Sequence, residues 1–358
     1  MKVLHVGEYV TGGVATYIRS LLKYQQKYIG EDNLYFLLSD LHSEKKWPID
    51  KKNIFYYKYK RNVLNIFTAI FQIYRYIDII NPDIIHVHST WAGLFVRSIY
   101  FIKRKQLKIV YCAHGWSFLM EITRIKKIAY SIVERLLSYN TDIIINISKF
   151  EHNYAIQSGI SASKCIMIYN GVSEVESINN KNLSLGEDIE KIKLLFVGRF
   201  DRQKGIDILL ELFEKYELAN VELYVIGQSV ISEQKFTIPN GVHQLGWINN
   251  SLIDQYYASC DAIIVPSRWE GFGLVAVEAM KNKKAVIASN RGALPEIVID
   301  GYNGFIFDID KKEELFELLN RLKKEKLVEM GMNGYKLYKD NFTDDLLNDK
   351  ILNLYKSL

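Results

Sequence analysis

The chain has 358 residues, which is too long for one ordinary α/β core and fits two domains. Hydrophobic residues make up 49% of it and only five residues are proline, so the composition excludes an intrinsically disordered protein. Residues 1–170 hold 23 Lys or Arg against 12 Asp or Glu, whereas the remainder holds 23 against 29. This imbalance predicts an anionic partner for the first half.

Membrane phospholipid, a lipid-diphosphate acceptor and nucleic acid all fit that charge, and so does a solvated lysine-rich surface. The three cysteines, Cys112, Cys165 and Cys260, lie far apart without metal-like spacing and are expected to be buried thiols in a reducing compartment. Residues 1–7 run directly into a strand, so no signal peptide is expected, and no uncharged apolar run approaches the ~20 residues of a membrane span. We therefore expect a cytoplasmic protein, free or peripheral on the inner face of the membrane.

Strands and helices alternate through a predicted first domain at residues 1–172. The opening strand, Lys2–Val6, leads through a glycine loop into an amphipathic helix at Val14–Tyr28. Short apolar strands separated by helical patterns are typical of a parallel sheet covered on both faces. Further strands are expected at 33–38, 53–59, 83–87, 108–112, 142–147 and 164–168, with helices at 63–80 and 123–138.

Residues 173–190 are rich in Asn, Ser, Glu and Lys and are the predicted linker. The alternation then restarts, which predicts a second parallel α/β domain at 191–340. Two such Rossmann-like domains facing each other would hold a ligand in the cleft between them, near the carboxyl ends of their strands. Elements of the second domain are expected at 192–197, 205–216, 221–226, 251–258, 261–265, 274–280, 285–288 and 311–323, with a last helix near 346–356.

The richest motif runs from Glu270 to Glu278, where two carboxylates surround a Gly-Phe-Gly turn that leads into an apolar helix. The preceding run, Asp261–Ser267, has the pattern of a buried strand and its exit loop. Free backbone N–H groups and the helix dipole converge at such a place, so it suits a phosphate-bearing ligand. Carboxylates favoured at a helix start by the dipole are the structural alternative.

Arg199 follows the first strand of the second domain, and Lys204 lies just before the next helix. Two cations on one loop can neutralise a diphosphate leaving group, as a magnesium ion does in many enzymes. Taken alone, these residues would be ordinary surface residues. Together with the Glu270–Glu278 motif in the same domain, they indicate an anion-binding site.

These motifs resemble the donor-sugar site of retaining nucleotide-sugar glycosyltransferases of family 4, the group 1 type of bacterial polysaccharide synthesis. The resemblance is dense over about 192–310, where Gly246-Trp247 and Gly292–Glu296 also follow the pattern, and thinner over 1–170, where acceptor recognition would diverge. It implies the GT-B architecture: an acceptor-binding domain at 1–172, a nucleotide-sugar-binding domain at 191–340, and a C-terminal helix within 341–358 that packs back on the first domain.

The resemblance also implies a reaction. A hexosyltransferase of this kind moves a sugar from a UDP- or GDP-linked donor to a hydroxyl of a glycan or lipid-linked acceptor, with retention and without a metal or other cofactor. Same-face attack with the leaving phosphate as base is the family's favoured account, and a covalent role for Glu270 stays open.

The resemblance further implies which residues contact the donor. Arg199 and Lys204 would contact the diphosphate, Glu278 the ribose hydroxyls, and Glu270 and His114 would lie near the transferred sugar. Sugar and phosphate oxygens would be bound by the backbone N–H groups of Phe272, Gly273, Leu274 and Val275.

Gly12 and Gly13 lie between the first strand and the first helix, where glycine lets backbone approach a ligand closely. By resemblance this loop lies beside the donor phosphates, and an ordinary turn is the alternative. The Gly-x-Gly-x-x-Gly fingerprint is absent, so no redox dinucleotide is expected. His86 and His88 alternate on a strand and share a face, but no third ligand is evident in the sequence, so no metal is expected there.

One departure from the family pattern follows Met280, where the family has a Gly and then a Pro and this chain has Lys283 and Ala285. We expect a changed turn, with Asn282 as its left-handed residue.

A second expectation concerns the aromatic and basic segments Phe95–Lys108 and Thr123–Arg135, which suit docking on an anionic membrane or else form a solvated basic face.

Three other classes of protein remain as alternatives. A sugar-nucleotide epimerase of the same architecture would share the diphosphate clamp but lack the Glu270–Glu278 spacing. A nucleic-acid-binding protein would explain the basic half, but no binding motif appears and no nucleic-acid partner is expected. A non-catalytic, anion-binding relative would keep the fold and lose the clamp.

Overall fold

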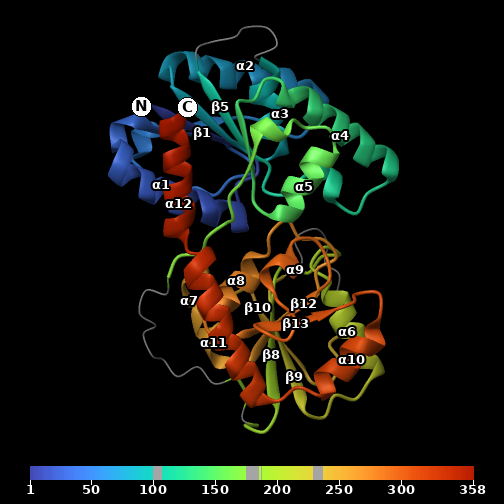
Figure 1. Ribbon diagram of the computed structural model, residues 1–358. Coiled ribbons are helices and arrows are strands. Elements are labelled where there is room, and N and C mark those ends of the chain that lie inside the picture. Colours follow the sequence, from blue (N-terminus) through green and yellow to red (C-terminus); the bar gives the residue numbers. More distant parts are fainter. Residues whose placement is uncertain (100–106, 175–184, 187, 229–236) are drawn as a thin grey trace. The chain divides into compact units, whose positions relative to one another are not determined.

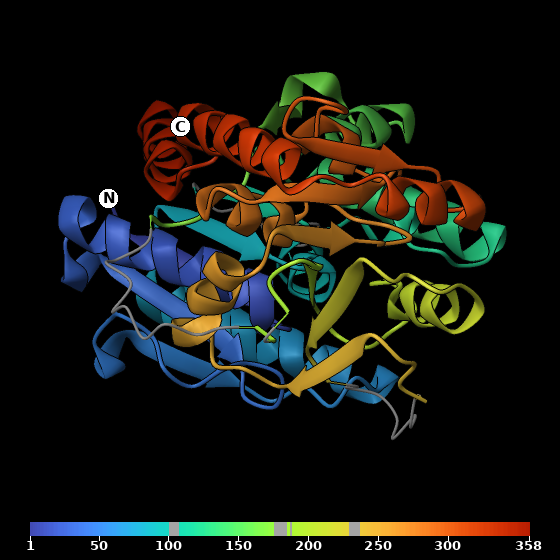
Figure 2. The same cartoon turned by 90° about the horizontal axis from the view of Figure 1, so that it is seen from below.

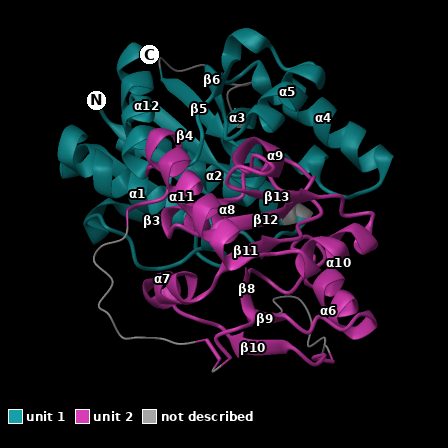
Figure 3. Cartoon of the chain, turned by 60° about the horizontal axis from the view of Figure 1, so that its bottom comes forward, with its two compact units in different colours: residues 1–171, 344–358 teal, residues 172–343 magenta. Residues whose placement is uncertain are grey.

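The computed structural model describes residues 1–99, 107–174, 185–186, 188–228 and 237–358. The chain divides into two compact units, unit 1 (residues 1–171 and 344–358) and unit 2 (residues 172–343), shown in teal and magenta in Figure 3. Most of the predicted linker lies outside the described residues. The prediction of an α/β protein built from two Rossmann-like domains is confirmed.

Unit 1 is a seven-stranded parallel sheet in the order β3-β2-β1-β4-β5-β6-β7. Its strands are largely buried on both faces, as expected of a sheet with helices on each side. The strands are β1 (Val3–Gly7), β2 (Leu34–Ser39), β3 (Ile54–Tyr57), β4 (Ile84–His88), β5 (Lys108–Cys112), β6 (Ile143–Asn146) and β7 (Cys165–Met167). The helices are α1 (Gly12–Ile29), α2 (Val63–Ile80), α3 (Thr90–Ile99), α4 (Arg124–Ser138), α5 (Lys149–Gln157) and α12 (Asp344–Ser357), with one-turn 3-10 helices at Glu31–Asn33, Lys51–Asn53, Ser117–Leu119 and Ala162–Lys164.

Unit 2 is a six-stranded parallel sheet in the order β10-β9-β8-β11-β12-β13. Helices cover both of its faces, with α6 and α10 on one side and α8 and α11 on the other (Figure 1 and Figure 2). The strands are β8 (Ile192–Val197), β9 (Val221–Ile226), β10 (Val242–Gly246), β11 (Ala262–Val265), β12 (Ala285–Ser289) and β13 (Gly304–Phe307). The helices are α6 (Ile206–Lys215), α7 (Asn250–Ser259), α8 (Leu274–Lys281), α9 (Leu294–Ile297), α10 (Lys312–Asn320) and α11 (Lys324–Asn341).

The strand order marks where each unit can bind a ligand. In unit 1 the order reverses between β1 and β4, and in unit 2 it reverses between β8 and β11. The loops that leave two such strands at their carboxyl ends diverge to opposite faces, and the crevice between them is the usual ligand site of open α/β sheets. Each unit therefore has one favoured position for a site, set by the topology alone.

The last helix belongs to unit 1 although unit 2 precedes it in the chain. Helix α12 packs along α1, where Ser20 Oγ donates to Asp344 Oδ2 at 2.9 Å and the Tyr24 hydroxyl donates to Asp349. Farther along α12, the Tyr355 side chain is buried against β4. The C-terminal segment thus completes the cover over one face of the unit 1 sheet.

A buried ion pair joins α3 to α4. Arg97 is fully buried, and its guanidinium donates to Glu134 Oε2 at 2.7 Å and lies 3.6 Å from the centre of the Tyr111 ring. The Tyr111 hydroxyl donates to the second carboxylate oxygen of Glu134 at 3.2 Å. This network of charged and polar groups joins the buried Leu137 in holding the inner face of α4 against the rest of unit 1.

The expected turn after Met280 is displaced by one residue. Asn282 has φ −89°, so it ends α8 with right-handed backbone, and the left-handed residue is Lys283 with φ 58°. Lys283 occupies the position where the resembled family has glycine, so a lysine here adopts a conformation that favours glycine. The prediction for Asn282 is wrong because its side chain instead donates to Asp254 at 2.8 Å and to the Glu278 carbonyl at 2.9 Å.

Candidate functional site

The β8–α6 loop of unit 2 carries the two predicted cations at the switch point. Lys204 Nζ lies 2.9 Å from Glu270 Oε2, and Arg199 Nε lies 2.8 Å from Asp201 Oδ2. Gly205 begins the helix with φ 72°, and a Cβ there would come 2.0 Å from the Pro266 carbonyl oxygen, so only glycine fits. The structure thus brings Lys204 and Glu270 together in one ion pair and holds each cation beside a carboxylate.

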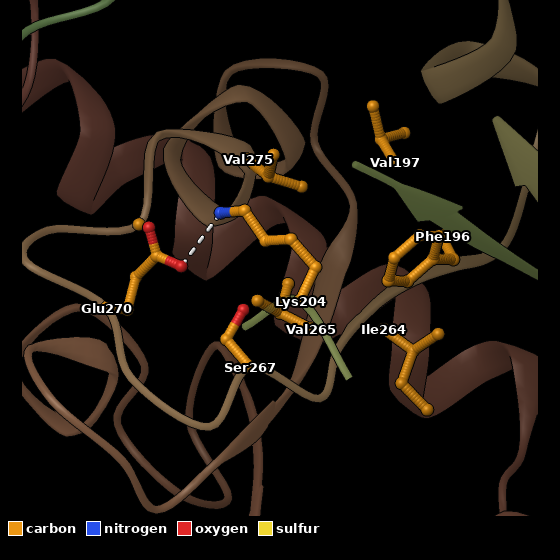
Figure 4. Close-up of a pocket in the computed structure, with 9 residues that line it drawn as sticks. Phe196, Val197, Lys204, Ile264, Val265, Ser267, Glu270 and Val275 are labelled. Carbon is orange, nitrogen blue, oxygen red and sulfur yellow. Dashed lines mark hydrogen bonds and ion pairs between the residues drawn. The ribbon is translucent and has the colours of Figure 1, made fainter. Parts of the chain in front are cut away.

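A small pocket surrounds this ion pair at the ends of β8 and β11 (Figure 4). Lys204 and Glu270 face each other across it, and Ser267 points toward them from the β11–α8 loop. The Ser267 hydroxyl is buried and has no hydrogen-bond partner among the described residues. Phe196, Val197, Ile264, Val265, Gly273 and Val275 form the rest of the wall. A polar floor with one unused hydroxyl and an ammonium is a suitable environment for an anionic or hydroxyl-bearing ligand.

The β11–α8 loop is fixed by glycine contacts on both sides. Gly273 precedes α8 with φ 112°, and the Glu270 carbonyl accepts the Ala293 N–H at 3.0 Å. A Cβ on Gly292, which has φ 60°, would come 2.1 Å from that same carbonyl oxygen. The Gly292-Ala293 turn therefore locks the backbone that carries Glu270, as a preformed site requires.

The start of α8 presents backbone N–H groups toward this region. Ala276 and Val277 donate to the Gly273 carbonyl, so the N–H groups of Gly273, Leu274 and Val275 precede the first intrahelical bonds. Phe272 differs from the other predicted contacts, because its side chain is buried and packs edge-on against Phe342, with ring centres 5.8 Å apart. Only the backbone of Phe272 can serve a ligand.

Glu278 lies on α8 one turn beyond these N–H groups. The buried Tyr257 hydroxyl of α7 donates to Glu278 Oε2 at 2.7 Å and fixes the carboxylate. Burial raises the pKa of Glu278, and the hydrogen bond from Tyr257 and the charge of Lys281 partly offset that rise. Sequence reasoning missed Tyr257, because nothing in the α7 pattern marks one of its two adjacent tyrosines as the partner of a residue 21 positions away.

In unit 1, Gly12 is the first residue of α1 and has φ 56° with open space where a Cβ would lie. Its N–H donates to Glu44 Oε1 at 3.3 Å, and Glu44 also pairs with Arg19. Gly12 and Gly13 are both exposed. A carboxylate of the chain thus already occupies part of the helix N-terminus at which an anionic ligand was expected.

His114 lies two residues after the end of β5 and has a left-handed backbone with φ 54°, which is uncommon for a residue other than glycine. Its ring lies 4.6 Å, centre to centre, from Tyr17 of α1. Three further histidines, His5, His86 and His88, lie buried beneath it, and one ring nitrogen of each lies within 4.8 Å of the others. His5 supplies the third imidazole that the sequence analysis did not find beside His86 and His88.

All four imidazoles are kept neutral by burial, which lowers the pKa of His5 to about 4 and that of His114 to about 3. Burial also lowers the pKa of His86 and His88 well below the ordinary value of about 6.5. The side chains that face the cluster are Tyr17 and Gln25 of α1, Tyr355 of α12 and Cys112 of β5, and all are uncharged at neutral pH because burial raises the pKa of the Cys112 thiol and of both tyrosines.

This neutral cluster predicts acid lability. Below about pH 6.5 the histidines of the unfolded chain bind protons, whereas the buried histidines of the folded cluster stay neutral. The free energy of unfolding is therefore fully present above that pH and falls as the pH drops toward 4, by about 1.4 kcal/mol per histidine per pH unit. We expect the unfolding free energy, measured by urea titration, to drop steeply between pH 6.5 and 4.5. His86→Phe should make the decline shallower, and His243→Gln, which alters an exposed histidine, should not. An unchanged free energy of unfolding over this pH range would contradict the interpretation that the buried histidines stay neutral in the folded protein.

Profiles of two protein families match consecutive parts of the chain. The Glycosyltransferase Family 4 profile matches residues 11–175, and the Glycosyl transferases group 1 profile matches residues 178–337. An uncharacterized 41.2 kDa protein from the cps region of Klebsiella pneumoniae is 32% identical over the full length of both chains. The O-antigen biosynthesis glycosyltransferase WbnH of Escherichia coli is 29% identical over 65% of each chain.

Solved structures share the fold at low sequence identity. A sucrose-phosphate synthase from Thermosynechococcus elongatus superposes with a TM-score of 0.83 and 19% identity, over 100% of this chain and 99% of that chain. HepE of Anabaena, solved in complex with UDP-glucose, gives a TM-score of 0.79 and 20% identity over the whole of both chains. Both comparisons place the two-unit α/β architecture among known enzyme folds.

Proposed function

Because this chain belongs to the group 1 glycosyltransferases of bacterial polysaccharide type, we propose that it transfers a hexose from a nucleotide-diphosphate sugar to an acceptor hydroxyl with retention. The observation that carries the proposal is the Lys204–Glu270 pair beside the N-terminus of α8 at the switch point of unit 2. A UDP-linked donor is favoured over a GDP-linked one, since HepE was solved with UDP-glucose. The cps-region relative and WbnH support a role in cell-surface polysaccharide synthesis.

In the proposed reaction the donor diphosphate lies against Lys204 and Arg199. An ammonium has three donors, so Lys204 can keep Glu270 and still bind two phosphate oxygens. The acceptor oxygen attacks the anomeric carbon as the bond from that carbon to the phosphate oxygen breaks, and the acceptor proton passes to the departing diphosphate. The ion pair with Lys204 makes Glu270 a weak nucleophile, which favours an electrostatic role for Glu270 over a covalent one.

Nucleotide binding tests the donor site directly. Glu278 is proposed to accept hydrogen bonds from the ribose hydroxyls, and bonds to a charged group contribute about 1.5–3 kcal/mol. We expect calorimetric titration in EDTA to find one nucleotide among UDP, GDP and ADP that binds preferentially, with about tenfold to hundredfold weaker binding to Glu278→Ala. Glu317→Ala, which removes an exposed carboxylate of α10 in the same unit, is the matched control. If none of the three nucleotides binds the wild-type protein, the donor-site assignment fails.

We further propose that unit 1 docks on an anionic membrane through α4, because the apolar stripe of this helix faces solvent. Ile125, Ile128, Ile132, Val133 and Leu136 recur with helical spacing and are between 42% and 80% exposed. A surface helix ordinarily buries such a stripe against its own domain. Here the inward side carries the Arg97–Glu134 pair and the buried Leu137, and the stripe lies on the outer side.

Basic residues flank the exposed stripe and give the face its predicted partner. Arg124, Lys126, Lys127 and Arg135 lie on the same helix, and the paired, buried Glu134 is its one acidic residue. An apolar stripe bordered by cations is the pattern of a helix that lies in the headgroup region of an anionic bilayer. Of the predicted Phe95–Lys108 segment, Phe95 and Arg97 are buried and cannot take part, and residues 100–106 lie outside the described residues. No helix among the described residues is long and apolar enough to span the bilayer.

Vesicle sedimentation tests the membrane proposal. We expect the protein to sediment with vesicles that contain phosphatidylglycerol and not with pure phosphatidylcholine, and to lose at least tenfold in binding when Ile125 and Ile132 are both changed to serine. Val328→Ser with Met332→Ser, which alters two exposed apolar residues of α11, should bind like the wild type. Equal binding by both double variants would show that α4 is not the docking surface.

A further inference from the structure

A line of hydrogen-bonded imidazoles crosses the core of unit 1 from α1 to His114. His5 lies on β1, opposite His86 of β4 in the parallel register, and His88 is the last residue of β4, opposite Cys112 of β5. Residues two apart on a strand share a face, so these side chains gather on the face of the sheet that α1 and α12 cover. The mechanism proposed above uses none of them, and only His114 was expected near the transferred sugar.

The contacts form one continuous chain of ring nitrogens. His5 Nε2 lies 2.8 Å from the amide oxygen of Gln25, and His5 Nδ1 lies 3.0 Å from His88 Nε2. His88 Nδ1 in turn lies 2.9 Å from His114 Nε2. His114 Nδ1 lies 3.6 Å from Cys112 Sγ, which is within range for a hydrogen bond to sulfur.

The groups at the two ends of this line of imidazoles are consistent with one assignment of which ring nitrogens carry hydrogen. An amide oxygen only accepts, so His5 Nε2 carries a hydrogen and His5 Nδ1, in a neutral ring, is an acceptor. His88 therefore donates from Nε2 and accepts at Nδ1, and His114 donates from Nε2 and accepts at Nδ1. The thiol of Cys112, a weak donor, faces the nitrogen of His114 that this order leaves as an acceptor.

We infer that His5 and His88 are positioning residues, which hold His114 as a neutral ring with hydrogen on Nε2 and a lone pair on Nδ1. His114 Nε2 already donates a hydrogen bond to His88. Nδ1 is therefore the nitrogen that can give up its weak hydrogen bond from the Cys112 thiol and accept a stronger one from a ligand hydroxyl. His114 is thus an acceptor for a hydroxyl group of the ligand and not a general acid. The identification of this ligand as the donor sugar rests on the proposed function, whereas the assignment of the tautomer does not depend on it.

Nitrogen NMR on protein labelled with ¹⁵N-histidine tests the tautomer without any substrate. We expect His114 to show a protonated Nε2 and an unprotonated Nδ1 from pH 5 to pH 8. In His88→Phe, the acceptor at His88 Nδ1 is lost, so the two neutral tautomers of the His114 ring should mix. His86→Phe is the matched control, because His86 lies on the same strand and face and its ring packs against His88, but its hydrogen bond goes to Tyr355 and not to another imidazole.

A second variant guards against misfolding of His88→Phe. Gln25→Met removes the accepting oxygen at the far end with little change of volume, and we expect it to loosen the single tautomer at His114 as well. A wild-type His114 that carries its hydrogen on Nδ1 would overturn the inference, and so would an unchanged His114 spectrum in both variants. A stoichiometric metal ion bound through His5, His86 and His88 would also overturn it, since His5 Nδ1 and His88 Nε2 would then both give lone pairs to the ion.

Kinetics separate this inference from the proposed function. If nucleotide binding fails while the tautomer is as assigned, the donor site is wrong and the positioning chain stands. If transfer activity is found, His88→Phe should lower kcat by about tenfold or more, whereas His86→Phe should not. Transfer by His88→Phe at the wild-type rate would show that the tautomer of His114 does not matter to the reaction.

Discussion

Replacing Lys204 by methionine is expected to lower the rate of sugar transfer by about 100-fold to 1,000-fold, the usual effect of removing one group that stabilises developing charge on a leaving group. Lys204 is the ammonium closest to the pocket at the ends of β8 and β11, and it is only 20% exposed, so water replaces its charge poorly. Hydrolysis of the donor nucleotide sugar by water needs no acceptor, so release of the nucleoside diphosphate measures the effect.

The matched control for Lys204→Met is Lys193→Met, which alters the second residue of β8 near the opposite end of the same strand. Lys193 Nζ donates to the Gly186 carbonyl and does not line the pocket. We expect donor hydrolysis by this control to match the wild type. A loss of less than tenfold in Lys204→Met, with its melting temperature unchanged, would remove Lys204 from the leaving-group site.

Replacing Glu134 by alanine is expected to lower the free energy of unfolding by about 3–5 kcal/mol, because it leaves the fully buried Arg97 guanidinium without its carboxylate. The Tyr111 hydroxyl loses its acceptor in the same substitution. Urea denaturation followed by circular dichroism measures the loss. Glu329→Ala, which removes an exposed partner of Lys326, should change the free energy of unfolding by less than about 0.5 kcal/mol.

A double variant distinguishes the cost of an unpaired charge from the cost of lost packing. Arg97→Met with Glu134→Leu removes both charges and keeps apolar volume, so we expect it to recover most of the stability that Glu134→Ala loses. If the double variant is as unstable as Glu134→Ala, the network stabilises α4 through its shape and not through its charge.

The architecture could be predicted because parallel strands buried on both faces leave a strong apolar signal. The predicted bounds of the strands at Lys108–Cys112 and Ile192–Val197 and of the helix at Val63–Ile80 agree with the structure. Helix α11 was missed, because Gly331 and Gly334 weaken its helical pattern. A Cβ on Gly331 would come 2.0 Å from the Lys283 carbonyl, so the glycine serves the packing of α11 against the turn after α8.

The candidate site could be predicted only as far as local motifs reach. Lys204 and Glu270 were expected in one site because both belong to motifs of the second domain that resemble a donor-sugar site, and the structure pairs them. His5, Tyr257 and Ser267 were missed. Their places depend on strand register and on helix packing, which join residues far apart in the sequence. The outward orientation of the apolar stripe of α4 could not be predicted for the same reason. The periodicity of the sequence predicts an amphipathic helix but not which of its sides faces the sheet.

The return of α12 to unit 1 has a consequence for how the protein is made. A ribosome releases residues 1–171 first, but Tyr355, which contacts His86, is synthesised only after the whole of unit 2. Unit 2 is continuous in sequence and can fold while α12 is still in the exit tunnel, whereas unit 1 receives α12 only after unit 2 has been synthesised. A nascent chain stalled before Asp344 should therefore present a protease-resistant unit 2 beside a unit 1 that chaperones still recognise.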